Sequence, residues 1–297
     1  MILNLAELKA SETQYFLQHV VAPRPICFAS TVDADGTPNL SPFSFFNLFS
    51  AQPPIVVFSP ARRVRDNTVK HTLENVLAVP EVVINMVSYD IVQQASLTSC
   101  DYPRGTDEFL KAGFTKEAAT LVRPPMVKES PAKMECRVLE VKSLGDSGGA
   151  GQLVICEVLV LHIDDRLLDA DRKINQADLD LVARLGGDWY CRASADSLFK
   201  VPKPNTKLGI GIDTLPAAIR GSRYLSGNHL GALANVHEPP VVQPSFADDH
   251  LKQIMQYYSL NPADLEKETH LYAARLLDEG RVDDAWQVLL TVSGDEQ

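Results

Sequence analysis

The uncharged segment from Gly36 to Ala61 carries the side chains whose types and spacing best suit ligand chemistry. Its residues 39–47 include serines, asparagines and phenylalanines but no charged side chain. Hydroxyl, amide and backbone groups can hydrogen-bond the carbonyl and imide edges of a flat heterocycle, while phenylalanines form its apolar walls. The residues alone leave two interpretations open, a polar binding loop for such a ring and a proline-rich structural loop.

Other patterns suggest chemistry less strongly. Gly145-Asp-Ser-Gly-Gly149 matches the string around the nucleophile of trypsin-like proteases, but the histidine segment and framing cysteines of that site have no counterpart, so a flexible hairpin loop is expected. Gly209-Ile-Gly211 lacks the third glycine of a dinucleotide fingerprint. The seven histidines show no zinc-binding spacing. We therefore assign no metal site and leave the catalytic residues unknown.

Composition narrows the class of protein. The chain has 297 residues, 45% of them hydrophobic, and its 38 acidic and 28 basic side chains give a net charge of −10. That balance disfavours nucleic acid and anionic membranes as partners, because both require a basic face. Five scattered cysteines without a CxxC pair are typical of reduced thiols, and no signal peptide is evident. We expect a cytoplasmic protein.

Periodicity predicts the elements that must position these residues. Apolar, β-rich runs at 24–32, 55–59, 81–87, 136–141 and 153–162 predict strands, and a turn is expected at 33–36. Helices are expected from the Asp66–Asn67 pair to Pro80, at 89–99, and at 178–185 before a glycine pair. Strands with single inserted helices favour a β-barrel over a βαβ sheet.

The character of the sequence changes after residue 204. Residues 205–245 show little periodicity, whereas 248–258, 262–277 and 281–291 predict three short, acidic helices. The sequence therefore predicts two parts, residues 1–204 with the barrel and residues 205–297 as a C-terminal extension that is first irregular and then helical.

The string RPICFAST…GTPNLSPFSFFN, from Arg24 to Asn47, resembles the flavin reductase-like family of FMN-binding split barrels. The similarity continues through residues 65–75, 107–109, 129–131 and 184–190, in the family's order, and covers residues 10–204. The family includes the reductase components of two-component flavin monooxygenases. The resemblance implies a mainly β fold with α insertions, an FMN-binding split β-barrel with Greek-key-like connections.

The resemblance also implies a cofactor site. Residues from the first loop would line the isoalloxazine ring and ribityl chain, and residues at a helix start would hold the phosphate, where free N–H groups favour an anion. The implied cofactor-binding residues are Ser30, Thr31, Asn39, Ser41, Pro42, Phe43, Ser44, Phe45, Asn47, Lys70, Thr72 and Asn75. His71 departs from the pattern, since the family usually has aspartate there.

The implied activity is hydride transfer from NAD(P)H to flavin in an FMN-binding oxidoreductase. Two alternatives stay open, another split-barrel redox enzyme similar to pyridoxamine-phosphate oxidase and a non-catalytic flavin- or haem-binding protein. The resemblance implies a homodimer with FMN near the interface and leaves room for a separate flavin-dependent monooxygenase as partner. Phe43, Phe45, Phe46 and Phe49 offer aromatic surface for such pairing, and residues 184–190 are candidates for the opposing wall.

Overall fold

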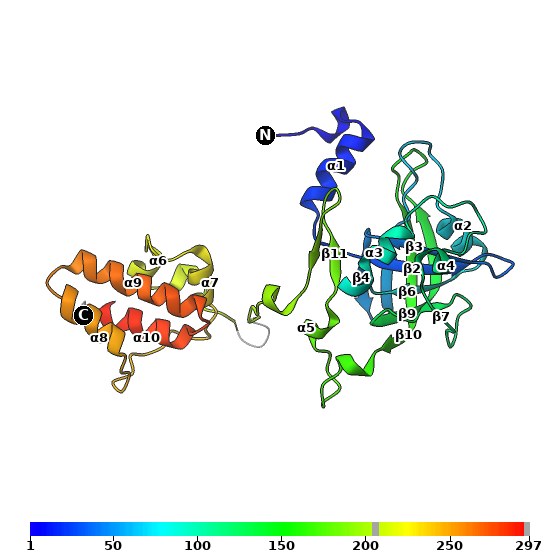
Figure 1. Ribbon diagram of the computed structural model, residues 1–297. Helices are drawn as coiled ribbons and strands as arrows, with labels where there is room; N and C mark the ends of the chain where they lie inside the picture. Colours follow the sequence, from blue (N-terminus) through cyan, green and yellow to red (C-terminus); the bar gives the residue numbers. More distant parts are fainter. Residues whose placement is uncertain (204–207, 294–297) are drawn as a thin grey trace. The chain divides into compact units, whose positions relative to one another are not determined.

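The computed structural model describes residues 1–203 and 208–293, which divide into two compact units, Met1–Phe199 and Lys200–Gln297 (Figure 1). The boundary expected between residues 204 and 205 lies outside the described residues. Within the described ranges, none of the helices has the length and apolar character needed to cross a membrane.

An antiparallel seven-stranded sheet forms the centre of the first unit. Its strands are β2 (Cys27–Val32), β3 (Pro38–Phe43), β4 (Phe46–Ala51), β5 (Pro54–Phe58), β6 (Glu81–Asn85), β9 (Ala132–Ser143) and β10 (Gln152–Ile163). They lie in the order β3-β2-β6-β9-β10-β5-β4. The strands expected from the sequence are all present, with shifted ends.

The two edges of this sheet are consecutive in the chain. Only Ser44 and Phe45 separate β3 from β4, although these strands end the sheet on opposite sides. Such a short connection requires the sheet to curl so that its edges approach one another. Among the described residues no ladder pairs β3 with β4, so the curled sheet is open along this side.

The segment expected to be a polar loop is instead mostly strand, which corrects the sequence prediction. β3 and β4 take up residues 38–43 and 46–51, with a two-residue connection between them. Pro38 and Pro42 disguise the first strand in the sequence, because proline lacks the N–H of a ladder. At an edge, where a strand has a neighbour on one side only, proline is tolerated.

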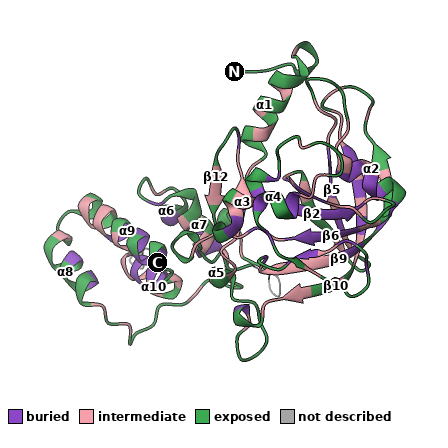
Figure 2. Cartoon of the chain, turned by 45° about the vertical axis from the view of Figure 1, so that its right-hand side comes forward, coloured by how far each residue is buried: buried purple, intermediate pink, exposed green. Residues whose placement is uncertain are grey.

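Apolar residues pack on both faces of β2. Cys27 and Ala29 face a core inside the curled sheet, whereas Phe28 faces a second core covered by α3 (Val92–Leu97) and α4 (Glu108–Ala112). Within the first unit, Figure 2 shows many buried residues in β2, β6 and α2 (His71–Ala78). Other elements of this unit include α1 (Ala10–Val20), β7 (Lys116–Glu117) and β8 (Met126–Val127). It also has four short 3-10 helices, η1 (Leu5–Glu7), η2 (Tyr89–Ile91), η3 (Asp165–Leu167) and η4 (Ala195–Ser197).

Helix α2 begins at His71, not at the expected Asp66–Asn67 cap. The Asp66 carboxylate accepts bonds from the backbone N–H and hydroxyl of Thr68, and Asn67 has a left-handed φ of 59°. These interactions close a turn before the helix, in the way short polar side chains compete with helical backbone bonds. Lys70 therefore occupies the N-cap position.

The helix expected at 178–185 is also wrong. The chain forms α5 (Gln176–Leu179), reverses at Asp180 with φ 45°, and continues as strand β11 (Val182–Arg184). This strand pairs with β1 (Arg24–Pro25) and β12 (Tyr190–Arg192) in a small second sheet. Pairing with a distant segment outweighs the local helical pattern.

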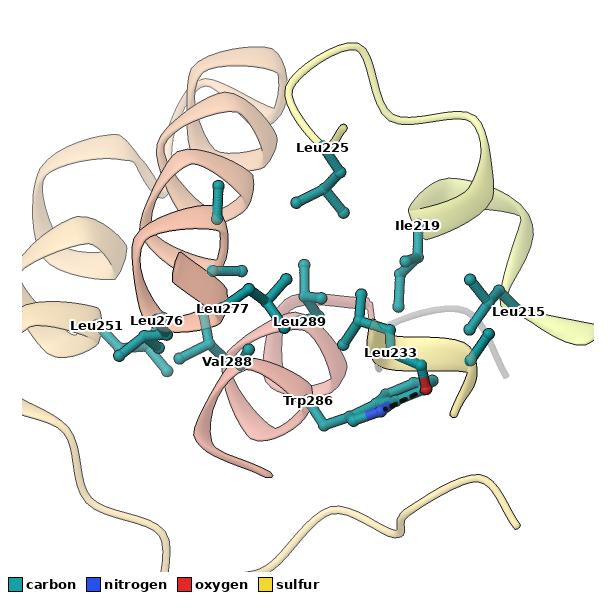
Figure 3. Packing of buried hydrophobic residues seen from close by; sticks show 14 residues of the cluster. Leu215, Ile219, Leu225, Leu233, Leu251, Leu276, Leu277, Trp286, Val288 and Leu289 are labelled. Atoms are coloured by element: carbon teal, nitrogen blue, oxygen red, sulfur yellow. Dashed lines mark hydrogen bonds between the residues drawn. The ribbon is translucent and has the colours of Figure 1, made fainter. Parts of the chain in front are cut away.

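The second unit is helical, and its last three helices confirm the sequence prediction. It comprises α6 (Ala217–Arg220), α7 (Gly227–Ala234), α8 (Asp249–Tyr258), α9 (Pro262–Asp278) and α10 (Val282–Ser293), preceded by η5 (Ile212–Thr214). Figure 3 shows the core of this unit, where buried Trp286 donates its indole N–H to the Leu233 carbonyl at 3.1 Å. The unit thus has an apolar core of its own.

Candidate functional site

A cavity of about 800 Å³ lies beside the start of α2. Thr13, Gln14 and Leu17 of α1 form one wall, and the segment 61–65 with Lys70 forms another. The volume falls within the roughly 300–1,000 Å³ typical of small-molecule and cofactor sites.

Arg24 holds α1 in place over this cavity. Its guanidinium donates to the carbonyls of Gln18 and Val21 at the end of α1, at 2.6 and 2.5 Å, and to the Leu185 carbonyl at 2.9 Å. Burial, and after it the nearby charge of Arg184, lowers the pKa of Arg24. No residue of α1 is itself buried. Arg24 therefore connects the C-terminal end of α1 to the backbone at Leu185.

Five basic side chains line the cavity, and we call the four other than Arg24 the cation cluster, namely Arg62, Arg63, Arg65 and Lys70. Three of them surround one carboxylate. Asp101 accepts from Arg63 at 2.8 Å and Arg65 at 2.6 Å, and it lies 3.4 Å from the Lys70 ammonium. Hydrogen bonds from Arg63 contribute most to lowering the pKa of Asp101 to about 2. Positive charge remains in excess, which favours an anionic ligand.

The protease-like string forms the hairpin loop that the sequence predicts, and this loop supports the cation cluster. The Gly149 N–H donates to the Arg62 carbonyl at 2.9 Å, and the Arg62 N–H donates to the Ala150 carbonyl at 2.9 Å. A Cβ at Gly148 would lie 3.0 Å from the carbonyl oxygens of both Arg63 and Val64. Glycine thus permits the close approach of the two backbones.

Several expected site residues form a buried network that fastens α2 to the β2–β3 hairpin. The Thr72 hydroxyl donates to Asn39 Oδ1 at 2.8 Å, and Asn39 Nδ2 donates to Glu108 Oε1 at 2.9 Å. Asn75 Nδ2 donates to Thr31 Oγ1 at 3.1 Å. Burial raises the pKa of Glu108. We call these five residues the buried network, namely Thr31, Asn39, Thr72, Asn75 and Glu108.

Most of the other expected cofactor residues lie in or next to the cavity. Lys70 and Phe45 line it. Pro42, Phe43 and Ser44 line an adjoining pocket of about 340 Å³, which shares residues Gln18, Arg24 and Ser99 with the cavity. Ser41 lines a small recess between Lys70 and the buried network. The structure thus gathers two segments distant in sequence, 39–45 and 70–75, around one region.

Two expected residues lie elsewhere. Ser30 is fully buried on the face of β2 that points away from α2, and its hydroxyl has no partner in the described part of the chain. Asn47 is exposed on β4, where its side chain accepts from the Leu48 N–H at 2.8 Å. Neither residue lines the cavity or its adjoining pocket.

The candidate wall at residues 184–190 does lie at the adjoining pocket. Arg184 and Tyr190 line it together with Pro42 and Ser44. The Arg184 guanidinium lies 4.5 Å from the centre of the Tyr190 ring and also donates to its hydroxyl. These two residues come from the same chain as the other wall.

Sequence reasoning missed α1, the three arginines, Asp101 and Gly148. One signal was visible, because Arg-Arg-Val-Arg directly follows 26 uncharged residues in an acidic chain. The contributions of α1 and Asp101 depend on tertiary packing and leave no local pattern.

Among the described residues, no group of three or more histidine, cysteine, aspartate or glutamate side chains is placed to hold a metal ion. Cys27, Cys136 and Cys156 share the apolar core inside the sheet, and burial raises the pKa of each thiol, that of Cys156 to about 12. They are protonated packing residues.

Comparison with known proteins places this arrangement in a family. The model of the flavin reductase like domain matches residues 20–178. An uncharacterized protein of Aquifex aeolicus is 35% identical over 182 residues, which cover 61% of this chain and 90% of that protein.

Solved structures agree with this match. Nitrilotriacetate monooxygenase component B from Bacillus cereus is 26% identical, with a TM-score of 0.63, over 68% of this chain and 98% of that one. A protein from Shewanella frigidimarina, named as a flavin reductase with a split barrel domain, is 28% identical, with a TM-score of 0.57, over 67% and 96%. The family match spans more than half of the chain, and it includes the curled sheet, the cation cluster and the buried network. The chain belongs to the flavin reductase-like family.

Proposed function

We propose that this chain binds FMN beside α2 and transfers a hydride to it from NAD(P)H. One observation carries the proposal. An anion-binding end, formed by the cation cluster, and a pocket lined by Pro42, Phe43 and Ser44 adjoin one another in the same groove. A single phosphate and a flat polar ring require these two environments, so the residues present fit the flavin.

The proposal assigns different tasks to the two groups of polar residues. Lys70 and the arginines bind the phosphate, because cationic donors make the strongest hydrogen bonds to phosphate oxygens. Pro42, Phe43 and Ser44 contact the ring, with Arg184 and Tyr190 as the facing wall. The buried network fixes the start of α2, and with it Lys70, relative to β3. In this proposal four members of the network affect flavin binding only by fixing these positions, namely Thr31, Asn39, Thr72 and Asn75.

When bound, the flavin supplies the hydride-accepting chemistry. The task of the protein is to orient the ring and to exclude water from one of its faces. Hydride transfer to the ring does not itself require a protein acid or base, so the proposal names no catalytic residue. The proposal includes both NADH and NADPH as hydride donors.

Two measurements test the proposal. Titration of FMN with the purified protein should quench flavin fluorescence saturably, and anaerobic mixing of the complex with NADH or NADPH should bleach the flavin absorbance. A protein that binds no FMN contradicts the site. Binding without bleaching by either donor contradicts the reductase activity and supports the non-catalytic carrier instead.

We also propose a homodimer. Phe45, in the connection before the edge strand β4, and Leu48 and Phe49, within β4, are exposed, with 40%, 63% and 68% of their surface accessible. Clustered apolar side chains of this kind are typical of interaction surfaces, and two-fold pairing is the commonest closed arrangement. By contrast, Phe43 is buried against Phe58, so the aromatic surface is smaller than the sequence suggests. Light scattering should give about twice 32.6 kDa.

A separate flavin-dependent monooxygenase is the partner that we propose for the reduced flavin. The similarity to component B of nitrilotriacetate monooxygenase supports this assignment. The test is a coupled assay in which a flavin-dependent monooxygenase is separated from this protein by a dialysis membrane. Substrate oxidation that requires this protein, NAD(P)H and FMN supports transfer by diffusion, and no oxidation contradicts it.

A further inference from the structure

Asp101 occupies an unusual position in the cation cluster. Its two carboxylate oxygens contact Arg63, Arg65 and Lys70, at 2.8, 2.6 and 3.4 Å. In the described part of the chain these three cations are its only side-chain partners. The carboxylate thus sits at the point where the three basic side chains converge.

Carboxylate and phosphate use the same donors. A guanidinium binds either group through parallel N–H donors, and both groups accept from an ammonium. The point of convergence of Arg63, Arg65 and Lys70 is therefore the location at which a phosphate would gain most from them. Asp101 already occupies that location, and it lines the same cavity.

The cluster has enough positive charge to attract a phosphate in addition to the Asp101 carboxylate, but the two anions compete for the same donors. Three cations face Asp101, and one of them, Arg65, also pairs with Asp66 at 3.0 Å. Arg62, whose side chain bonds only Asn67 among the described residues, adds a fourth positive charge, so the cluster keeps a positive excess. A phosphate is therefore attracted to the cluster as a whole. It is repelled by Asp101 nearby, and it must share or displace the bonds from Arg63 and Arg65.

We propose that Asp101 is a built-in competitor that weakens phosphate binding in this cavity and makes bound flavin exchangeable. The inference rests on the proposed function, because it takes FMN as the phosphate-bearing ligand. Asp101 lies in the connection after α3, and its side chain is 36% exposed, so it can turn toward solvent when a phosphate enters. It acts through the cations and is a positioning residue.

The experiment compares FMN with riboflavin, which has the same ring and no phosphate. Asp101→Asn removes the charge and keeps the size of the side chain. We expect FMN to bind roughly tenfold more tightly and to dissociate correspondingly more slowly, since a like charge close to the phosphate is lost. Riboflavin affinity should stay the same, so the preference for FMN over riboflavin should rise by the same factor.

Two variants serve as controls. Asp35→Asn makes the same charge change in the exposed turn between β2 and β3, outside the cavity lining, and should leave both affinities unchanged. Asp101→Glu keeps the charge and should behave like the unaltered protein. If Asp101→Asn does not fold, as judged by its melting curve, Asp101→Ser takes its place.

The outcomes separate this inference from the proposed function. Unchanged or weaker FMN binding in Asp101→Asn overturns the inference, as does an equal gain for riboflavin. If the unaltered protein binds neither flavin, the proposed function fails, and calorimetric titration of inorganic phosphate decides about Asp101 alone. Tighter phosphate binding in Asp101→Asn then supports the competitor role, and unchanged binding contradicts it.

Discussion

The buried network and the cation cluster lie next to each other at the start of α2, yet they differ in almost every physical respect. Members of the network are buried and bond one another, whereas the cluster is partly exposed and lines a cavity. Thr72 and Lys70, two residues apart, belong to opposite groups. The difference teaches that the polar residues of one sequence motif divide into those that bond one another in the interior and those that line the cavity.

The two groups should respond to mutation in opposite ways. Removing a partner from a buried polar network leaves donors without acceptors, so the cost falls on folding. Removing an exposed cation costs little folding free energy, because exposed ion pairs contribute about 0–1 kcal/mol. The loss of such a cation should instead weaken the binding of an anionic ligand.

The largest expected effect is that of Glu108→Ala on stability. This change strands two buried donors, Asn39 Nδ2 and the Leu40 N–H, which now bond the carboxylate at 2.9 and 3.1 Å. We expect the free energy of unfolding to fall by about 2–4 kcal/mol. Urea denaturation measures it.

Glu108→Gln provides the matched control. It keeps one carbonyl acceptor and should lose less than half as much stability as Glu108→Ala. FMN affinity, measured for the folded protein, should change by less than about threefold in either variant, since Glu108 is placed in the scaffold. A stable Glu108→Ala protein with much weaker FMN binding would reverse the assignment of this residue.

Lys70→Ala should show the opposite pattern. Loss of a charge-assisted bond to phosphate is expected to weaken FMN binding by about 1.5–3 kcal/mol. Unfolding free energy should change by less than about 0.5 kcal/mol, because the only ion-pair partner of Lys70 in the described part of the chain is the partly exposed Asp101. Flavin titration and urea denaturation on the same samples measure both quantities.

Riboflavin and a second lysine sharpen this test. Riboflavin affinity should not respond to Lys70→Ala, and Lys142→Ala, at an exposed position of β9, should affect neither flavin. Unchanged FMN affinity in Lys70→Ala would remove Lys70 from the phosphate site.

The sequence predicts much of the fold but only part of the division between the buried network and the cation cluster. Apolar, β-rich runs correctly indicate β2, β6, β9 and β10, and helical spacing indicates α8–α10, because these patterns are local. Prolines conceal β3, and tertiary pairing with β1 turns the expected helix at 178–185 into β11. Local patterns do not carry such information.

The candidate site shows the same limit. Motif similarity leads to Lys70 at the cavity and to Asn39 and Thr72 nearby. It does not reveal that Asn39 and Thr72 bond each other, nor that Asp101 lies among the arginines, since both facts depend on contacts 31 or more residues apart. The motif finds the region, and the fold decides which of its residues face the cavity.

Thr31→Val tests the network at its other end, with a smaller effect. The change keeps the shape of the side chain but strands the Asn75 amide, which donates to Thr31 at 3.1 Å. We expect a loss of about 1–2 kcal/mol in unfolding free energy. The neighbouring Ser30→Ala is the control, since the Ser30 hydroxyl has no partner among the described residues, and it should cost less than about 0.5 kcal/mol. Equal losses in both variants would mean that the Asn75 bond contributes nothing.

The smallest expected effect is a pH dependence of opposite sign in the two groups. Burial raises the pKa of Glu108 above its ordinary 4.5, so its contribution to stability is full below pH 4.5 and is lost as pH rises through the folded-state pKa. The pKa of Asp101 is lowered from 3.8 to about 2, mainly by hydrogen bonds from Arg63, so its contribution is present above pH 3.8 and is lost as pH falls toward 2.

Stability measured against pH should therefore respond differently to two neutralising variants. Glu108→Gln should flatten the decline above pH 4.5, and Asp101→Asn should flatten the decline below pH 3.8. The second change should be below about 1 kcal/mol, because solvent screens a carboxylate that is one-third exposed. If both variants alter the same limb of the profile, the two carboxylates share one environment, and the distinction between a buried network and a ligand-facing cluster is wrong.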